Sequence, residues 1–563
     1  MEFRNMNNLE ELDLSHNLIE DIKGFERQSM LGKLELLDLS YNSFNGIIPS
    51  LGFLSSLKTL SLQGINLNGS IDIGDNIKGL KSLSKLKMLN LRWNEMKGLV
   101  TSNGLDGLKH LQELYLDYSS IDKIFLHNVG VMSSLRVLTL RNISLNGSLP
   151  NQGWCKFPNS ISIPPSLEAL GISNNHMSGN LPRWMGNMSN LIGIAIFSNH
   201  FEGPIPVEFC KLGNLKFLDL SKNNLSGSIP SCFNQLRVKH VHLNRNQLSG
   251  LMTSAFYNNS SLVTLDLSDN HLNGTIPSWI ESLHVLNILL LKFNNFEGEI
   301  PVQLCQLKQL SILDLSENNF SGSIPPCFHE IPFETTHEKS SLETRYQMGG
   351  ISTFSLWTFV EGSKSLGEHY MMDVGYGTII FHSLDVQQKV ELTTKHGSYA
   401  YKGEIPLEMG NLSNIRVLNL SHNNLFGSIQ STFLQLKQIE SLDLSYNRLN
   451  GKTPSQLIEL DKLEVFSVAY NNLSSATPDQ KAQFATFEES SYKGNLFLCR
   501  LPLRTNCNKT VPTSTMSKGL ERKIEDGGFI DMEVFYSYII ALLGIVAILF
   551  KKSALATSLV SPR

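Results

Sequence analysis

The feature that most constrains this chain is a unit that repeats at a nearly fixed spacing. Residues 262–325 contain three near-copies of it, in which Asn270, Asn294 and Asn318 lie 24 residues apart. Self-similarity at such a period indicates a solenoid, in which each unit forms one coil and stacks on its neighbours. The sequence therefore predicts a repeat architecture that exceeds the usual size of a domain because it grows by stacking.

Each copy contains a short strand followed by the asparagine. The leucines of the strand, such as Leu313 and Leu315, alternate with other residues, which is typical of a strand that faces a core on one side. The asparagine amide carries donors and an acceptor, so a stack of them is predicted to bond the turn backbone of neighbouring coils. A Gly-x-Ile-Pro segment then turns the chain back. Together these elements predict an α/β solenoid of the leucine-rich type with a parallel sheet.

The repeat occurs at sixteen positions equivalent to Asn318. Residues 1–331 hold about 13 repeats, and residues 403–484 hold 3 more and a partial one. Half of the first six positions lack the asparagine, so we expect the N-terminal coils to be less regular than the middle ones. The sixteen positions are Asn17, Asn42, Ile65, Asn94, Ser119, Ile143, Asn175, Asn199, Asn223, Asn246, Asn270, Asn294, Asn318, Asn423, Asn447 and Asn471.

Composition and motifs exclude several classes of function. The net charge of −4 gives no basic footprint for nucleic acid. The fifteen histidines have no metal-ligand spacing, and no nucleophile elbow, phosphate loop or zinc-protease motif is present. We therefore expect no enzyme activity, no metal and no cofactor.

Three segments interrupt or follow the repeats. Residues 332–402 hold no repeat but many aromatic residues, which favours a partly ordered insertion over a mobile segment. Residues 485–508 are predicted to form a cap closed by a cysteine pair, and 509–533 a polar linker with an acidic collar. Residues 534–550 are apolar and precede two lysines, which predicts a transmembrane helix with residues 551–563 in the cytoplasm. A buried core helix is the alternative.

The first repeat begins at Leu9 without a signal peptide or a cysteine-paired cap. An incomplete sequence is the favoured interpretation, and a genuine intracellular form is the alternative.

Cysteines and glycosylation motifs indicate an extracellular compartment. Two cysteine pairs share a spacing of 22 residues and are predicted to bridge adjacent coils, with buried free thiols as the alternative. The predicted disulfides are Cys210–Cys232, Cys305–Cys327 and, in the cap, Cys499–Cys507; Cys155 has no assigned partner. The Asn-x-Ser/Thr motifs are Asn68, Asn142, Asn146, Asn187, Asn224, Asn258, Asn259, Asn273, Asn319, Asn411, Asn419, Asn472 and Asn508.

Ligand-binding candidates are the outward strand positions that depart from the usual Asp and Ser. Repeats four to six depart together and predict an exposed patch of aromatics and arginines, types enriched at interface hot spots. This patch comprises Asn90, Arg92, Trp93, Glu113, Tyr115, Asp117, Tyr118, Thr139 and Arg141. A basic step is predicted at Lys239, His240, His242 and Arg245, and a third departure at Leu290, Lys292 and Phe293. Random drift of exposed positions is the alternative.

The chain resembles the plant leucine-rich-repeat receptor-like proteins. The resemblance rests on the repeat pattern, the insertion ending in VELTTKHGSYAYKG, the cysteine cap, the acidic collar and the MEVFY entry to the apolar run. It implies a right-handed superhelix whose concave sheet, helped by the insertion, binds a peptide, protein or glycan. It also implies a kinase-less, single-pass receptor of the plasma membrane with extracellular repeats. Such a receptor signals through membrane-bound adaptor and co-receptor kinases in defence or development.

Two departures from the family pattern carry further predictions. The family has another repeat directly after a Tyr-Lys-Gly such as 401–403, so its absence here predicts an altered register where the insertion rejoins the sheet. Gly544 alone remains of the glycine-spaced motif in the span, which weakens pairing through the membrane. The alternatives to a receptor are an extracellular binder that inhibits a secreted enzyme and a decayed receptor copy.

Overall fold

The computed structural model describes most of the repeat region. The described residues are 8–20, 31–44, 51–67, 83–94, 110–119, 132–149, 166–252, 254–325, 415–429, 431–505 and 507, with the backbone of four further strands at 69–72, 96–100, 390–394 and 397–401. The chain divides into one unit over residues 1–507 and a second over residues 508–563. The second unit lies outside the described residues.

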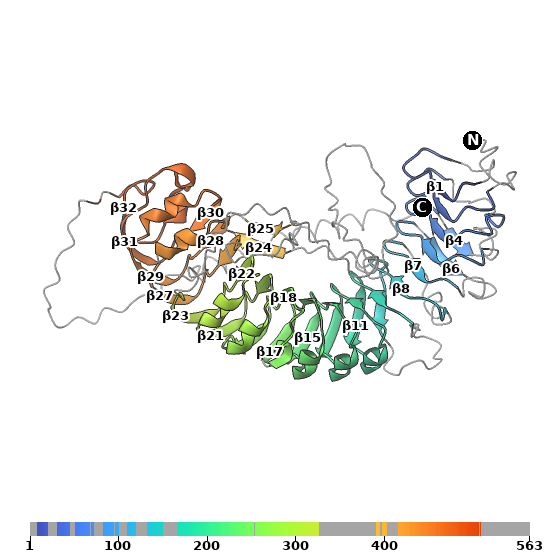
Figure 1. Ribbon diagram of the computed structural model, residues 1–563, viewed down its shortest axis with the longest axis horizontal. Helices are drawn as coiled ribbons and strands as arrows, with labels where there is room; N and C mark the ends of the chain where they lie inside the picture. Colours follow the sequence, from blue (N-terminus) through green and yellow to red (C-terminus); the bar gives the residue numbers. More distant parts are fainter. Residues whose placement is uncertain are drawn as a thin grey trace, which may run out of the picture. The chain divides into compact units, whose positions relative to one another are not determined.

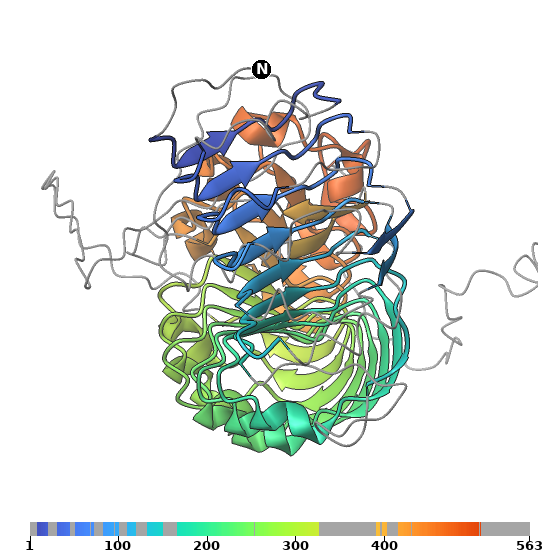
Figure 2. The same cartoon turned by 90° about the vertical axis from the view of Figure 1, so that its right-hand side faces the viewer.

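The first unit is built around one parallel sheet with sixteen strands, one for each of the sixteen repeat positions (Figure 1). Its strands stack side by side in chain order (Figure 2). They are β1 (Glu11–Asp13), β2 (Leu36–Asp38), β3 (Thr59–Ser61), β5 (Met88–Asn90), β7 (Glu113–Tyr115), β8 (Val137–Thr139), β10 (Ala169–Gly171), β12 (Gly193–Ala195), β14 (Phe217–Asp219), β16 (His240–His242), β18 (Thr264–Asp266), β20 (Ile288–Leu290), β22 (Ile312–Asp314), β26 (Val417–Asn419), β28 (Ser441–Asp443) and β30 (Val465–Ser467).

A second parallel sheet follows the turn of each coil from β9 onward. Its twelve strands are β9 (Asn146–Ser148), β11 (His176–Asn180), β13 (His200–Pro204), β15 (Asn224–Gly227), β17 (Gln247–Leu251), β19 (His271–Gly274), β21 (Asn295–Glu299), β23 (Asn319–Ser323), β27 (Asn424–Ser428), β29 (Arg448–Gly451), β31 (Asn472–Ala476) and β32 (Phe497–Cys499). Two smaller pairs are β4 (Gly69–Asp72) with β6 (Met96–Val100), and the antiparallel hairpin of β24 (Val390–Thr394) with β25 (Gly397–Tyr401).

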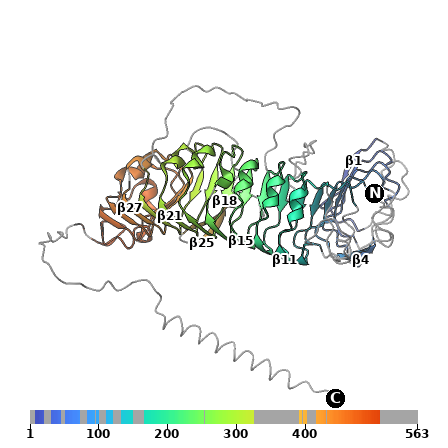
Figure 3. The same cartoon turned by 90° about the horizontal axis from the view of Figure 1, so that it is seen from below.

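Short 3-10 helices complete the regular coils (Figure 3). Most begin directly after the proline that ends the turn of the coil, whose fixed φ starts the helical turn. They are η5 (Arg183–Asn187), η6 (Val207–Lys211), η7 (Ser231–Gln235), η8 (Ser254–Phe256), η9 (Ser278–Ser282), η10 (Val302–Gln306), η13 (Ser431–Gln435), η14 (Ser455–Glu459), η15 (Ala482–Ala485) and η16 (Glu489–Ser491).

The repeated asparagine bonds neighbouring coils, as the sequence predicts. Asn294 Nδ2 donates to Leu267 O of the preceding coil at 3.0 Å and to Leu291 O and Lys292 O of its own coil. Its Oδ1 accepts the backbone N–H of Leu272 at 3.0 Å. The same pattern continues past the sixteenth repeat to Asn495, in the segment predicted to be a cap. A buried amide thus satisfies turn backbone that no strand partner reaches.

Leucine and phenylalanine fill the core between the two sheets. Leu289, Leu313 and Leu418 on successive strands have no exposed surface, and Phe296 and Phe320 stack with ring centroids 6.1 Å apart. Gly298 lies next to this stack with φ of +77°, and a Cβ there would come within 2.9 Å of Thr275. Glycine at this turn therefore permits both the left-handed backbone and the close approach of the coils.

The predicted register change after the insertion is wrong. Strand β22 pairs directly with β26, matching Leu313 with Leu418, just as β20 matches Leu289 with Leu313. The asparagine bonds also cross this junction, because Asn423 Oδ1 accepts the N–H of Phe320 at 3.0 Å. The leucine spacing of each strand fixes its register against the previous coil, whatever lies between them.

Two disulfide bonds have both cysteines within the described residues. Cys210 of η6 and Cys232 of η7 are bonded with Cα atoms 5.8 Å apart, and Cys499 is bonded to Cys507. Cys305 is also disulfide-bonded, while its predicted partner Cys327 and the unassigned Cys155 lie outside the described residues. Within the described part of the chain no helix is long and apolar enough to cross a membrane. The predicted span 534–550 falls beyond that part.

Candidate functional site

The open face of the sixteen-stranded sheet carries all the predicted ligand-binding side chains. On each strand the central apolar residue, a leucine in most coils, enters the core, and the residues on either side of it point the other way, onto this open face. Neighbouring parallel strands lie about 4.8 Å apart, so side chains on successive coils come into contact. Cross-strand pairs therefore decide which of the predicted residues a ligand can reach.

Strands β5, β7 and β8 bring two arginines to one aspartate. Asp117 is fully buried and Oδ2 accepts bonds from Arg92 Nε at 2.8 Å and Arg141 Nη2 at 3.3 Å. Its Oδ1 accepts the backbone N–H of Arg141 at 2.9 Å. The Arg92 guanidinium also lies 4.5 Å from the ring centre of Tyr115, a cation–π geometry. These contacts tie three coils together through side chains.

A buried carboxyl lies beside this ion cluster. Tyr115 Oη donates to Glu113 Oε2 at 2.6 Å, and both side chains are more than nine-tenths buried. Burial raises the pKa of Glu113 above its ordinary value, although the Tyr115 bond and the charge of Arg136 act in the opposite direction. The carboxylate therefore adds a cost to the folded state at neutral pH.

The prediction that this whole patch is exposed is wrong. Glu113, Tyr115, Asp117, Thr139 and Arg141 are between 0% and 9% exposed, because they bond and pack with one another across the strands. The exposed part is an aromatic pair at the end of the strands. Trp93 is 52% exposed and stacks on Tyr118 with ring centroids 4.1 Å apart. Asn90 bonds to Ser61 and Gln63, so it too serves the sheet.

Of the four residues predicted to be basic at β16, at least one, His240, carries no positive charge. His240 contacts Thr264 Oγ1 at 3.2 Å, and burial with the charges of His242 and Lys239 lowers the pKa of His240 to about 3. It is therefore neutral, which corrects its prediction as a cation. Phe217 of β14 lies beside both rings. Lys239 and Arg245 are exposed, and Arg245 Nε lies 3.7 Å from Asp269 Oδ2.

The third predicted departure is mostly internal. Leu290 is 2% exposed and packs with Ile288, Ile312 and Val417, so it belongs to an apolar cluster on the open face. Lys292 is 8% exposed and lies 4.0 Å from the buried Asp314, whose pKa burial raises. The prediction that these positions face solvent is wrong because adjacent strands bury them. Phe293 remains, at 43% exposed.

The usual Asp and Ser of the strands have a local role. Asp314 Oδ1 accepts bonds from the backbone N–H and the hydroxyl of Ser316 at 3.1 and 2.6 Å. The same pair forms at Asp219 and Ser221. These residues stabilise the turn at the end of the strand, so their departure elsewhere is not in itself a sign of a ligand.

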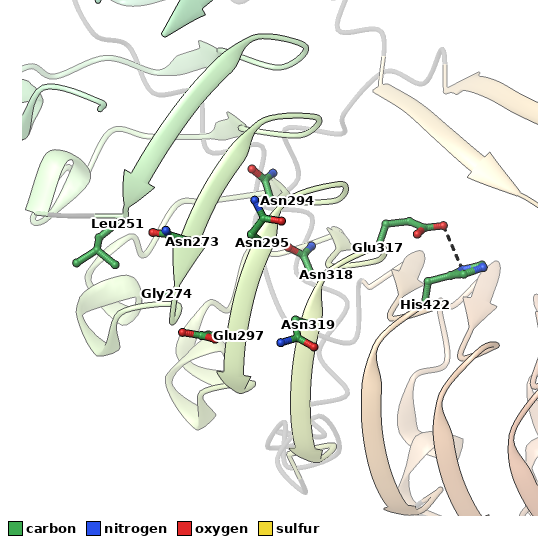
Figure 4. A pocket seen from close by; sticks show the side chains of 10 residues that line it. All are labelled: Leu251, Asn273, Gly274, Asn294, Asn295, Glu297, Glu317, Asn318, Asn319 and His422. Carbon is green, nitrogen blue, oxygen red and sulfur yellow. Dashed lines mark ion pairs between the residues drawn. The ribbon is translucent and has the colours of Figure 1, made fainter. Parts of the chain in front are cut away.

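A shallow polar pocket of about 700 Å³ lies away from the predicted patch (Figure 4). Asn273, Asn295 and Asn319 line it from strands of the second sheet, and Glu317 and His422 form an ion pair at its rim, with Oε1 and Nδ1 3.4 Å apart. Amides and carboxylates suit a polar ligand. Within the described residues no group of three His, Cys, Asp or Glu could hold a metal ion.

The sequence reasoning missed one exposed aromatic row. His422, Tyr446 and Tyr470 stack in succession, with ring centroids 4.1 and 4.3 Å apart. They occupy the same repeat position as Trp93, immediately before the asparagine, and all have a left-handed backbone with φ of 52–58°. The regular spacing of this position in the sequence is the signal that could have found them.

Some asparagines of the predicted glycosylation motifs are buried and others are exposed. Asn259 and Asn419 are 2% and 7% exposed, and Asn259 Nδ2 donates to Val238 O, so a glycan on either is incompatible with this fold. Asn68, Asn411 and Asn508 lie outside the residues whose side chains are described. The exposed motifs are Asn142, Asn146, Asn187, Asn224, Asn258, Asn273, Asn319 and Asn472.

Comparison with solved structures finds plant receptor ectodomains. The Arabidopsis receptor kinase HAESA, solved with an extended IDA peptide hormone ligand, matches with a TM-score of 0.60 and 26% identity over 90% of this chain and 72% of that one. The plant peptide hormone receptor RGFR1, in complex with RGF2, matches with a TM-score of 0.57 and 25% identity over 84% and 65%. These likenesses agree with the repeat architecture of the described coils.

Comparison of sequences finds repeats and receptor-like relatives. A family model described as "Leucine rich repeat" matches residues 237–296 and 411–473, and a second matches 33–54, 214–236 and 309–331. "Cuscuta receptor 1" of Solanum lycopersicum is 44% identical over 92% of this chain, which spans 46% of that protein. "Receptor-like protein 39" of Arabidopsis thaliana is 29% identical over 34% of this chain and 26% of its own length. Both relatives are named as receptors or receptor-like proteins. The repeats, the asparagine bonds and these similarities together show a leucine-rich-repeat chain that is similar to plant receptor-like proteins over most of its length.

Proposed function

We propose that this chain is the ligand-binding and membrane-anchoring part of a kinase-less cell-surface receptor. In this proposal the open face of the sheet binds a peptide, protein or glycan outside the cell. Residues 534–550 cross the lipid bilayer once, and partner receptor kinases carry the signal. The observation that carries the proposal is 44% identity with a named receptor over 92% of the chain.

The exposed aromatic pair supports a binding role for the open face. Trp93 and Tyr118 stack at the end of strands that the ion pairs of Asp117 with Arg92 and Arg141 hold together. A rigid, partly exposed aromatic surface binds with little loss of conformational entropy, which is why such residues are frequent at interface hot spots. We place the first ligand contacts here, with Phe293 as a second exposed ring further along. Both structural relatives described above were solved with peptides bound, and we therefore favour a peptide.

The membrane proposal rests on the apolar run and its flanks. The run contains no charge over 17 residues, follows four acidic residues and precedes Lys551 and Lys552. The lysines place the C-terminus in the cytoplasm by the positive-inside rule. The right-handed superhelix implied by the family resemblance belongs to the same proposal.

The test is the topology of the full chain behind a cleavable secretion signal in plant cells. We expect the chain to remain in membranes, to shift in gel mobility after removal of N-glycans, and to lose its repeats to protease added outside intact cells. A C-terminal tag should resist that protease.

The matched control is the same protein ending at residue 533. We expect it to be glycosylated and released into the medium. Release of the full chain would contradict the receptor proposal and favour the secreted binder. A chain that reaches the surface and places its C-terminal tag outside would contradict the proposed orientation.

A further inference from the structure

A local excess of positive charge marks two adjacent coils in the middle of the sheet. Residues 211–245 contain six lysines and arginines and one aspartate, in a chain whose net charge is −4. Part of this charge gathers at one edge of strands β14 and β16. We call the residues Lys216, Arg237 and Lys239 the basic edge. Lys216 is half-buried, and Arg237 and Lys239 are exposed.

Backbone bonds show which residues are neighbours along this edge. The residue before each strand accepts backbone bonds from the next coil, and in this way Glu168, Ile192, Lys216, Lys239 and Val263 follow one another. Lys216 and Lys239 are therefore neighbours of each other, and the residues that flank this pair, Ile192 and Val263, are apolar. On strands elsewhere along the same edge, opposite charges pair, as at Lys58 with Glu35 and at Arg416 with Glu440.

Within the described residues the basic edge has no carboxylate at ion-pair distance. Lys216 Nζ instead donates to the backbone O of Arg237 at 3.4 Å, which holds its ammonium beside a second cation. The pKa of Lys216 is lowered by its partial burial and then by the charges of Lys239 and Arg237. Three cations thus lie together without internal compensation, an arrangement that costs free energy until an anion binds.

The two coils are also held rigidly. The disulfide between Cys210 and Cys232 links η6 to η7, the 3-10 helices that precede β14 and β16 in the chain, on the side away from the open face. A stapled pair of coils keeps the spacing of the three cations, so a ligand loses less free energy in ordering them.

We propose that the basic edge binds an acidic segment of a peptide ligand, with aspartate or glutamate carboxylates between Lys216 and Lys239. This inference rests on the proposed receptor function and adds the chemistry of its ligand. Neighbouring strands lie about 5 Å apart, a spacing at which the carboxylates of successive acidic residues can reach both lysines. The net charge of −4 gives no extended basic surface for a nucleic acid. The neutral, half-buried His240 next to the edge, packed on the buried ring of Phe217, would contact apolar neighbours of those carboxylates.

The test measures binding of a fluorescein-labelled hexaglutamate peptide to the full chain, purified in detergent, by fluorescence anisotropy. We expect saturable binding that weakens as salt rises, and no binding of hexaglutamine. Reversing both charges with Lys216→Glu and Lys239→Glu should weaken binding at least about tenfold, since attraction becomes repulsion. The neutral pair Lys216→Gln and Lys239→Gln should give a smaller loss.

The matched control reverses two exposed lysines of other coils, Lys308→Glu and Lys452→Glu, and so changes the net charge equally. We expect it to bind like the original chain. Equal loss in the control, unchanged binding in the Lys216 and Lys239 variants, or equal binding of hexaglutamine would each overturn the proposal. Tighter binding of hexagalacturonate than of hexaglutamate would assign the edge to an acidic glycan instead of a peptide. None of these variants alters residues 534–550, so failure here leaves the topology test unaffected.

Discussion

The coils of β5–β8 and the coils of β18–β22 hold themselves together in different ways. In the middle coils every repeat supplies the same asparagine, and Asn294 reaches the preceding coil at Leu267 O. In the N-terminal coils Ser119 replaces it, and its hydroxyl makes the equivalent bond to Leu91 O at 3.0 Å, while Ile143 supplies no such donor. Here the ion pairs of Asp117 with Arg92 and Arg141 connect the coils instead. Where the backbone bonds of the repeat are incomplete, side chains on the open face replace them.

Removing the aspartate should have the largest effect. Asp117→Ala leaves two arginines without their buried partner, which typically costs about 3–5 kcal/mol. We expect faster hydrogen exchange in peptides covering 110–119 and 132–149 and unchanged exchange in 288–318. Asp117→Asn should lose less, because it can still accept the N–H of Arg141. Equal loosening of both regions would refute the distinction between them.

The corresponding change in the middle coils is Asn294→Ala. It leaves the backbone N–H of Leu272 without its acceptor and removes one of the two asparagine amides that donate to Leu267 O and to Leu291 O, at a cost of about 2–3 kcal/mol. Hydrogen exchange should quicken around residues 267–296. The adjacent Asn295→Ala is the control, since Asn295 is exposed and belongs to the second sheet. A similar response to both changes would show that the amide bonds add little.

The stability of the N-terminal coils should depend on pH through the ionisation of Glu113. Its pKa is raised in the folded state, so the ionised carboxylate destabilises the fold once pH rises above the ordinary value of 4.5, and increasingly until it is fully ionised. Glu113→Gln should therefore raise stability at pH 7 by about 1 kcal/mol, a common scale for single changes, and give no gain at pH 4. Thermal unfolding of both proteins across this pH range provides the measurement. A gain that is independent of pH would mean that shape rather than charge is responsible.

The smallest effect should come from the exposed rings. Trp93→Ala removes the stack on Tyr118 and should cost about 0.5 kcal/mol. Phe293→Ala, at the same left-handed position in a middle coil, is exposed and has no ring neighbour among the described residues, so it should cost less. The two costs can be compared by measuring how much hydrogen exchange quickens at residues 110–119 in Trp93→Ala and at residues 288–318 in Phe293→Ala. A larger loss at Phe293 would reverse the comparison.

The repeat pattern predicted the fold well because it reports the core directly. Leucine spacing determined the strands, and the amide of Asn294 determined its contacts. The candidate site was predicted less well, since alternation along one strand says nothing about the next coil. Tyr115 and Arg141 point away from the core as predicted, yet they are buried and contact Arg92 and Asp117 of the preceding coils. Lys239 was predicted as a candidate but Lys216, at the equivalent position of the preceding coil, was not, because the sequence of one strand does not show that these two lysines are neighbours.

The direct pairing of β22 with β26 also has a consequence for the order of folding. Asn423 and Phe320 are 103 residues apart in sequence, whereas ordinary neighbouring coils are joined through about 24. Closing the longer loop costs about 1.3 kcal/mol more chain entropy. Coils on either side can grow from their own nuclei before this contact forms, so the junction is the natural slow step of folding. Once it closes, the residues between can change in length at little further cost, because the penalty rises only with the logarithm of loop length.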